Sequence, residues 1–92
     1  MKAYKLLEKP EHWTTGQFAR DAEGRGCHSH STRAVSWCAR GAIEKCYKDL
    51  TVFPALERLW EAIGARVGII NWNDDPKRTH AQVVAMLKKA NV

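Results

Sequence analysis

The clearest helical pattern in the chain covers residues 33–48, RAVSWCARGAIEKCYK. Small or apolar side chains recur in it every three or four residues, the spacing that places them on one face of an α-helix. The inward-facing residues are Val35, Cys38, Ala42 and Cys46, with Ala39, Ile43 and Tyr47 beside them. Thr32 or Ser31 can cap the start of this helix. Gly41 costs about 1 kcal/mol relative to alanine, so we expect another stretch of backbone to pack closely against it.

Three further helices are predicted outward from this segment. Residues 54–63 carry an apolar stripe at helical spacing, Leu56, Leu59, Trp60 and Ile63, between Pro54 and Gly64. Residues 80–90 follow a capping box formed by Thr79 and Gln82, and Val83, Leu87 and Ala90 face inward. A short helix over residues 2–9 ends at Pro10.

Two segments do not look helical. Residues 16–33 are rich in glycine, serine and threonine, and they predict a β-hairpin with its turn at residues 23–26. Residues 66–72 are short and apolar, which fits a buried strand or an irregular packed segment. The predicted fold is α+β and α-rich, with three to four helices packed on a small antiparallel β-hairpin in a single compact domain over residues 1–92.

Composition narrows the class of protein. A hydrophobic content of 45% with four tryptophans excludes a wholly disordered chain, and a net charge of +5 favours anionic partners. No apolar run reaches the roughly 18–20 residues that span a bilayer, so no membrane association is expected. Three cysteines form no disulfide framework, and we expect reduced thiols and a cytoplasmic location in a host cell.

A basic stripe on the predicted 33–48 helix is the main candidate for a binding surface. Arginine suits phosphate contacts, and tryptophan suits stacking on bases or a protein hot spot. The residues predicted to bind the partner are Arg20, Arg25, Arg33, Trp37, Arg40, Lys45 and Lys48. Glu44 lies within the stripe, and the alternative interpretation is a solvated helix face with Trp37 packed against the hairpin.

The sequence contains little that indicates catalysis. Cys27-His28-x-His30 lacks the spacing of a zinc site, and neighbouring side chains of an extended segment point to opposite faces. We therefore predict no catalytic residue, no metal, no cofactor and no small-molecule substrate. A small enzyme that depends on cysteine or a metal remains an alternative.

Three motifs carry a resemblance to a known family. They are Trp37-Cys38-x-x-Gly41-Ala42-Ile43, then Trp72-Asn73-Asp74, and then Thr79 with Val83 and Leu87. The chain resembles a family of small uncharacterised proteins from phages and prophages, which implies an accessory role and assigns no chemistry.

By analogy with anti-CRISPR proteins, we expect a phage binding protein that inhibits a host nucleoprotein complex. The example is an RNA-guided surveillance complex, blocked sterically and electrostatically, with contacts to host protein or ribonucleoprotein and to nucleic-acid phosphates. The alternative is a small DNA-binding transcriptional regulator that uses the helices at 33–48 and 54–63 as a helix-turn-helix.

Overall fold

The computed structural model describes all residues, 1–92, and has the predicted α+β, α-rich architecture. Its helices are α1 (Ala3–Leu6), α2 (Ala39–Cys46), α3 (Val52–Ile63), α4 (Ile69–Asp74) and α5 (His80–Ala90). Its strands are β1 (Ala19–Arg20), β2 (Gly26–Cys27) and β3 (Ser36–Trp37), and single 3-10 turns cover Pro10–His12 and Asp49–Thr51.

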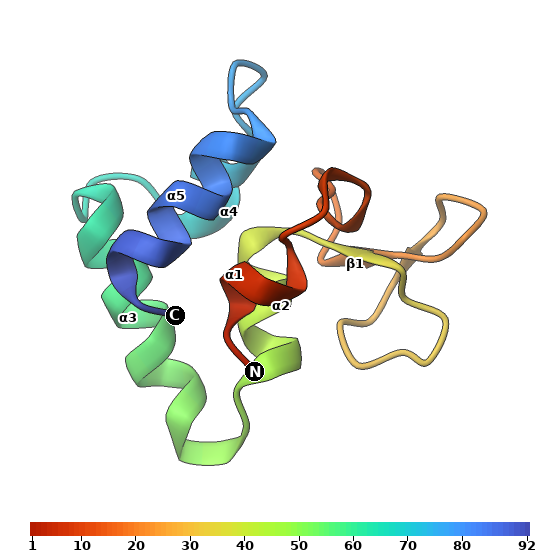
Figure 1. Cartoon of the computed structure of the whole chain (residues 1–92), viewed down its shortest axis with the longest axis horizontal. Coiled ribbons are helices and arrows are strands. Elements are labelled where there is room, and N and C mark those ends of the chain that lie inside the picture. The colour runs from red at the N-terminus through yellow and green to blue at the C-terminus, as the bar shows by residue number, and fades with distance from the viewer.

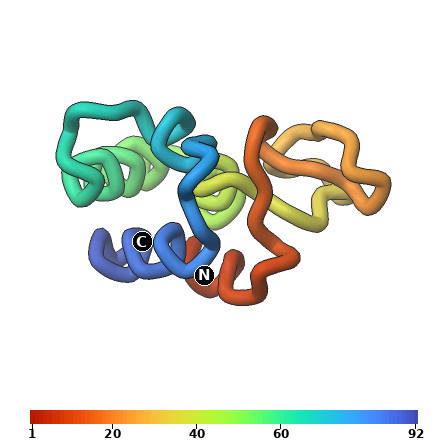
Figure 2. The backbone as a smooth tube through the Cα atoms, turned by 90° about the horizontal axis from the view of Figure 1, so that it is seen from above, coloured from red at the N-terminus to blue at the C-terminus, as the bar shows by residue number.

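The helices form two layers, and the small sheet projects from one side (Figure 1). Seen from above, α1 and α5 lie in one layer, and α2, α3 and α4 lie behind them (Figure 2). The domain measures 34 × 32 × 19 Å, so it has two broad faces.

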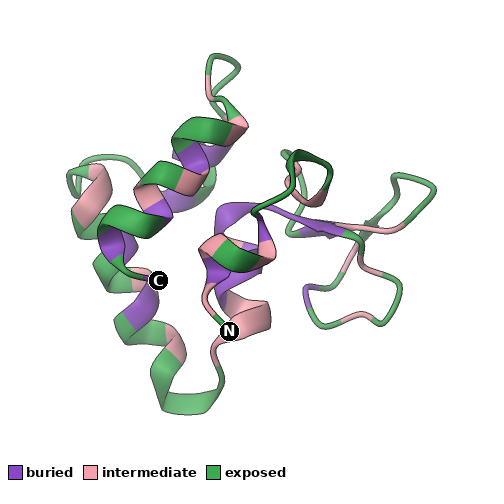
Figure 3. Cartoon of the chain, in the orientation of Figure 1, coloured by how far each residue is buried: buried purple, intermediate pink, exposed green.

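The core lies between the two layers (Figure 3). Its largest fully buried apolar side chains come from both layers and from the end of the chain: Leu7, Ile43, Leu59, Val83, Leu87 and Val92. Each contributes roughly 1.5–3 kcal/mol through removal from water. The first and last segments are joined here, since the Tyr47 hydroxyl and the Ala3 N–H both donate to the Val92 carbonyl.

The predicted hairpin is confirmed, and a third strand joins it. Strand β1 pairs antiparallel with β2 on one side and with β3 on the other. The turn between β1 and β2 contains Gly24 at φ +80°, a left-handed conformation that favours glycine.

The prediction that the central helix begins at residue 33 was wrong. Residues 33–38 precede α2, and within them Ser36 and Trp37 pair with β1, while the Val35 N–H donates to the Arg20 carbonyl at 2.8 Å. Sheet pairing satisfies the backbone here, and it overrides the helical spacing of the apolar residues. Val35 is consequently exposed, whereas Trp37 is buried. The helix starts only after Cys38, whose sulfur accepts a hydrogen bond from the Gly41 N–H at 3.3 Å.

The expectation for Gly41 is confirmed. A Cβ atom at this position would overlap the carbonyl oxygen of Phe18. The missing side chain therefore lets α2 lie directly against the strand segment that leads into β1.

The prediction of a strand or an irregular segment over residues 66–72 was wrong for its second half, because the short helix α4 begins at Ile69. Ile69 and Trp72 are one helical turn apart and both are buried, and α4 packs against α2 and α3.

Helix α5 agrees with its prediction. Thr79 and Gln82 form the capping box, and Val83, Leu87 and Ala90 are buried.

Candidate functional site

An open groove lies beside α3 and α4, with a volume of about 460 Å³. We call it the α3–α4 groove. It is lined by Arg40, Phe53, Leu56, Glu57, Trp60, Glu61, Gly68 and Ile69.

Two aromatic side chains stand exposed along this groove. Phe53 is 73% exposed and Trp60 is 42% exposed. Helix α3 places Ala55 and Leu59 in the core, so Phe53 and Trp60, two turns apart, lie together on a neighbouring face. The apolar stripe predicted for this helix includes Trp60, and the structure leaves its side chain partly exposed. Single exposed apolar residues are ordinary, but a contiguous exposed patch in a hollow is typical of a binding surface.

The exposed apolar surface continues toward the sheet. Phe18 and Ile70 are partly exposed and line a smaller hollow of about 160 Å³ next to α4. The Arg40 guanidinium lies 5.9 Å from the centre of the Phe18 ring, so it links this hollow to the α3–α4 groove. Cys38 lines the smaller hollow, and burial raises the pKa of its thiol, which keeps the sulfur protonated and poorly nucleophilic at neutral pH.

The charge at the edge of the groove is negative. Glu57 and Glu61 are exposed, one helical turn apart, and take part in none of the ion pairs of the structure. Arg40 is neutralised by Glu44, with 3.2 Å between Nε and the carboxylate. The groove therefore combines an apolar floor with two uncompensated carboxylates.

The position of α4 beside this groove depends on Asn73. Its side chain is fully buried and uses both ends of the amide. Oδ1 accepts from the Trp13 indole N–H at 2.8 Å and from the Ala39 N–H at 3.0 Å. Nδ2 donates to the Thr14 carbonyl at 3.1 Å and to the Asp74 carboxylate at 2.9 Å. Asn73 thus fastens α4 to the start of α2 and to the N-terminal segment.

Two of the predicted partner-binding residues are structural. Trp37 is buried, and its indole N–H donates to the Ser29 carbonyl at 3.0 Å. Arg20 donates to Thr14 Oγ1 at 2.9 Å and to the carbonyls of Thr15 and Gly24 at 2.8 Å each. The guanidinium of Arg20 thus ties β1 to the segment before it and to the β1–β2 turn, and the buried Trp37 offers no stacking surface.

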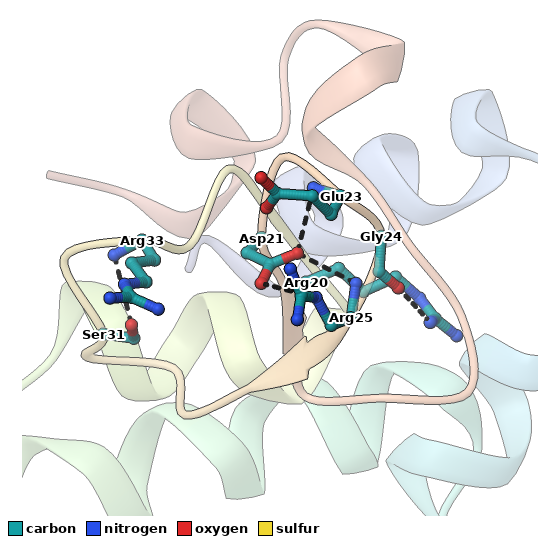
Figure 4. Close-up of polar contacts among 7 residues, drawn as sticks. All are labelled: Arg20, Asp21, Glu23, Gly24, Arg25, Ser31 and Arg33. Atoms are coloured by element: carbon teal, nitrogen blue, oxygen red, sulfur yellow. Dashed lines mark hydrogen bonds and ion pairs between the residues drawn. The ribbon is translucent and has the colours of Figure 1, made fainter.

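Arg25 and Arg33 do lie at one hollow, and Figure 4 shows the polar contacts of each. They line a hollow of about 450 Å³ together with Asp21, Ala22 and Glu23. Asp21 accepts hydrogen bonds from the Glu23 and Arg25 N–H groups and lies 3.9 Å from Arg25 Nε. Two arginines and two carboxylates balance in this hollow, so it has no net charge.

The remaining predicted cations are distributed elsewhere. Arg40 lines the α3–α4 groove, Lys45 lies in the last turn of α2, and Lys48 follows that helix. The single basic stripe does not form, because residues 33–38 are not helical and the offsets that would align Arg33 with Arg40 do not apply.

The Cys27-His28-x-His30 segment is arranged around its own backbone. The His28 and His30 rings stack with centres 5.6 Å apart, and the His30 N–H donates to His28 Nδ1 at 3.2 Å. No hydrogen bond joins Cys27 to a histidine, and no three His, Cys, Asp or Glu side chains gather in an arrangement suited to a metal ion.

Comparison with known proteins identifies one family. A family model described as a family of unknown function, DUF6197, matches residues 1–91. The chain belongs to this family. The chain has no match among curated proteins or solved structures. Membership of DUF6197 confirms the resemblance to an uncharacterised family, while phage origin and an anti-CRISPR role stay predictions. None of the helices has the length and apolar character needed to cross a membrane.

Proposed function

We propose that this DUF6197 protein is a non-catalytic binding protein that receives a segment of a partner protein in the α3–α4 groove. The observation that carries this proposal is the exposure of Phe53 and Trp60 over a groove of about 460 Å³. Aromatic residues and arginine are enriched at the energetic centres of protein interfaces. Arg40, one of the residues predicted to bind the partner, lines the same groove.

Burial of the two aromatic side chains would contribute a substantial part of the binding energy. A Phe or Trp buries about 150–250 Å² when fully covered. At about 25 cal/mol per Å², covering the exposed parts of Phe53 and Trp60 yields roughly 2–4 kcal/mol each before the losses of association. A gain of this size is typical of hot-spot residues.

The carboxylates at the groove edge indicate the chemistry of the partner. Glu57 and Glu61 favour lysine or arginine, and the apolar floor favours aliphatic or aromatic side chains. The proposed occupant is therefore an amphipathic segment with apolar residues on one side and basic residues beside them.

Such a segment fits the predicted nucleoprotein target, because proteins that bind nucleic acid present lysine and arginine to phosphates. By binding such a basic segment, this protein would compete with the nucleic acid that the segment normally contacts. Inhibition of a host complex by a phage protein is the narrower form of the proposal.

The alternative of a helix-turn-helix regulator is less well supported. Helix α3 would be the recognition helix, yet its exposed residues include Glu57, Glu61 and two aromatic rings, with Arg58 as the only cation of the helix. Carboxylates on that side would repel the phosphates that flank a major groove.

Fluorescence anisotropy with designed peptides tests the proposal. The probes are a labelled 16-residue amphipathic peptide with leucines on one face and lysines on the other, and the same peptide with glutamate in place of lysine. We expect the lysine peptide to bind and the glutamate peptide to bind much more weakly. Phe53→Ser and Trp60→Ser should each weaken binding about 30-fold, the equivalent of about 2 kcal/mol.

Matched controls separate the groove from general effects. Val35→Ser removes an exposed apolar side chain outside the groove and should leave binding unchanged. The double variant Glu57→Gln/Glu61→Gln should weaken binding, whereas Glu8→Gln/Glu11→Gln, with the same change in net charge, should not. Equal effects of the two pairs, or equal affinity for both peptides, would contradict the proposal.

A further inference from the structure

The last part of the chain has the strongest charge asymmetry in the sequence. Residues 76–92 contain four lysines and arginines and no aspartate or glutamate. Helix α5 occupies most of this segment and turns Val83, Leu87 and Ala90 into the core. Its solvent side carries Ala81, Gln82, Ala85, Lys88 and Lys89.

The fold adds cations from the opposite end of the chain. Helix α1 packs beside α5, in the same layer of the domain (Figure 2). Lys2 Nζ donates to the Asn91 carbonyl at 2.9 Å, and Lys88 Nζ lies 6.0 Å from the centre of the Tyr4 ring. Lys5 is paired with Glu8 at 4.0 Å, but both side chains are well exposed, so this ion pair is weak and easily exchanged.

One side of α5 contains a hollow that has cations and no acid. Its volume is about 310 Å³, and it is lined by Trp72, Arg78, Gln82, Ala85, Met86 and Lys89. The Arg78 guanidinium lies 4.1 Å from the centre of the Trp72 ring, and its Nε donates to the Trp72 carbonyl at 3.0 Å. Arg78 is therefore held in place before any ligand arrives, which lowers the entropy lost on binding.

We infer that this surface binds the phosphodiester backbone of a nucleic acid. The surface, which we call the basic face, consists of Lys2, Lys5, Arg78, Gln82, Lys88 and Lys89. Lysine, arginine and glutamine are common donors to phosphate oxygens. The small side chains of Ala81 and Ala85 allow a strand to approach the helix closely.

The dimensions of α5 suit several phosphates. Seven residues separate Gln82 from Lys89, which corresponds to a rise of about 10 Å along the helix. A nucleic-acid strand carries one phosphate per roughly 3.4 Å of helix axis, so about three phosphates lie within that length. An anionic membrane fits less well, because the apolar residues of α5 are packed in the core and none of its faces is free to insert between lipids.

This inference goes beyond the proposed function and shares no residue with the α3–α4 groove. The two surfaces also have opposite charge, since the groove edge carries Glu57 and Glu61. Together they would allow one small domain to contact both the protein and the nucleic acid of a nucleoprotein complex.

Salt-dependent fluorescence anisotropy tests the inference. The probes are fluorescein-labelled 20-nucleotide single-stranded RNA, single-stranded DNA and duplex DNA, each of mixed sequence, at 50–200 mM salt. One phosphate contact for each of the five cations of the basic face predicts a slope of log K against log salt of about −3.5 for single strands and about −4.5 for duplex DNA. The slopes and affinities of the three probes also distinguish RNA from DNA as the source of the phosphates.

A pair of variants with equal charge locates the binding surface. Lys88→Gln/Lys89→Gln should reduce the size of the slope by about 1.4–1.8 and weaken binding at 0.1 M salt by about 25- to 60-fold. Lys45→Gln/Lys48→Gln removes the same charge at the end of α2, and it should change the slope by less than about 0.3 and the affinity by less than about twofold. Far-ultraviolet circular dichroism checks that both variants are folded.

Three outcomes would overturn the inference: no measurable binding to any of the probes, equal losses in the two variants, or tighter binding to anionic phosphatidylserine vesicles than to nucleic acid. The groove variants separate this result from the proposed function. Phe53→Ser should bind nucleic acid as tightly as the wild type, and Lys88→Gln/Lys89→Gln should still bind the lysine peptide.

Discussion

Replacement of Asn73 with alanine should destabilise the fold strongly, because this side chain joins three separate segments of the chain. The amide is fully buried and makes four hydrogen bonds, two as acceptor and two as donor. Alanine removes both functions and leaves their partners in place.

The magnitude follows from the fate of those partners. Asp74 is partly exposed and can turn to water, but the Ala39 N–H, the Trp13 indole N–H and the Thr14 carbonyl lose their bonds in buried or half-buried positions. Each unsatisfied group costs about 1–3 kcal/mol. With partial entry of water, we expect a loss of about 3–5 kcal/mol in the free energy of unfolding, a large share of the 5–15 kcal/mol typical of a domain.

Urea denaturation followed by tryptophan fluorescence measures this loss. With a slope of about 1–1.5 kcal/mol per M, the midpoint should fall by at least about 2 M. Asn71→Ala is the matched control, because Asn71 lies on the same helix two residues earlier and is exposed. It should change stability by less than about 0.5 kcal/mol. A loss below about 1 kcal/mol for Asn73→Ala would refute the view that this amide fastens α4 to α2.

Three more predictions follow from single contacts. Gly41→Ala should destabilise the protein despite the better helix propensity of alanine, because its Cβ would overlap the Phe18 carbonyl, and any gain in thermal midpoint would contradict the close approach. Arg20→Met should speed amide hydrogen exchange over residues 14–25, since it removes the bonds to Thr14, Thr15 and Gly24, whereas Arg33→Met should not. Burial raises the pKa of the Cys38 thiol above its usual 9.0, so the unfolded chain releases this proton at a lower pH than the folded protein does. The free energy of unfolding should therefore fall as the pH rises above about 9. Urea midpoints at pH 8 and pH 10 measure this fall, and a smaller fall in Cys38→Ser would confirm its sign.

The proposed binding surfaces differ from the predicted basic stripe for a physical reason. A face of a helix exists only where the segment is helical, and residues 33–38 lie outside α2. The sequence spacing of Arg33, Trp37 and Arg40 therefore does not place these residues on one side of a helix. Trp37 pairs with β1 and is buried, while Arg40 moves to the edge of a groove formed with α3 and α4.

Trp60 illustrates a second limit of helical spacing. It belongs to the i, i+3, i+4, i+7 stripe together with Leu56, Leu59 and Ile63, and this pattern gives the direction of the apolar side but not its width. Only Leu59 of these four is fully buried. The layer of α5 covers one side of the stripe, whereas Trp60 lies toward its edge and stays 42% exposed.

Local chemistry in the sequence determined the class of fold, the helix of residues 80–90 with its capping box, the hairpin and the close approach at Gly41. These features depend on residues within a few positions of one another, or on the missing side chain of one glycine. The course of residues 33–38, the burial of Trp37 and the bonds of Asn73 were decided by tertiary structure, because their partners are distant in sequence: Ala19 for Trp37, and Trp13 and Ala39 for Asn73. The basic face has the same origin, since Lys2 and Lys88 come from opposite ends of the chain and lie on one surface only because α1 packs beside α5.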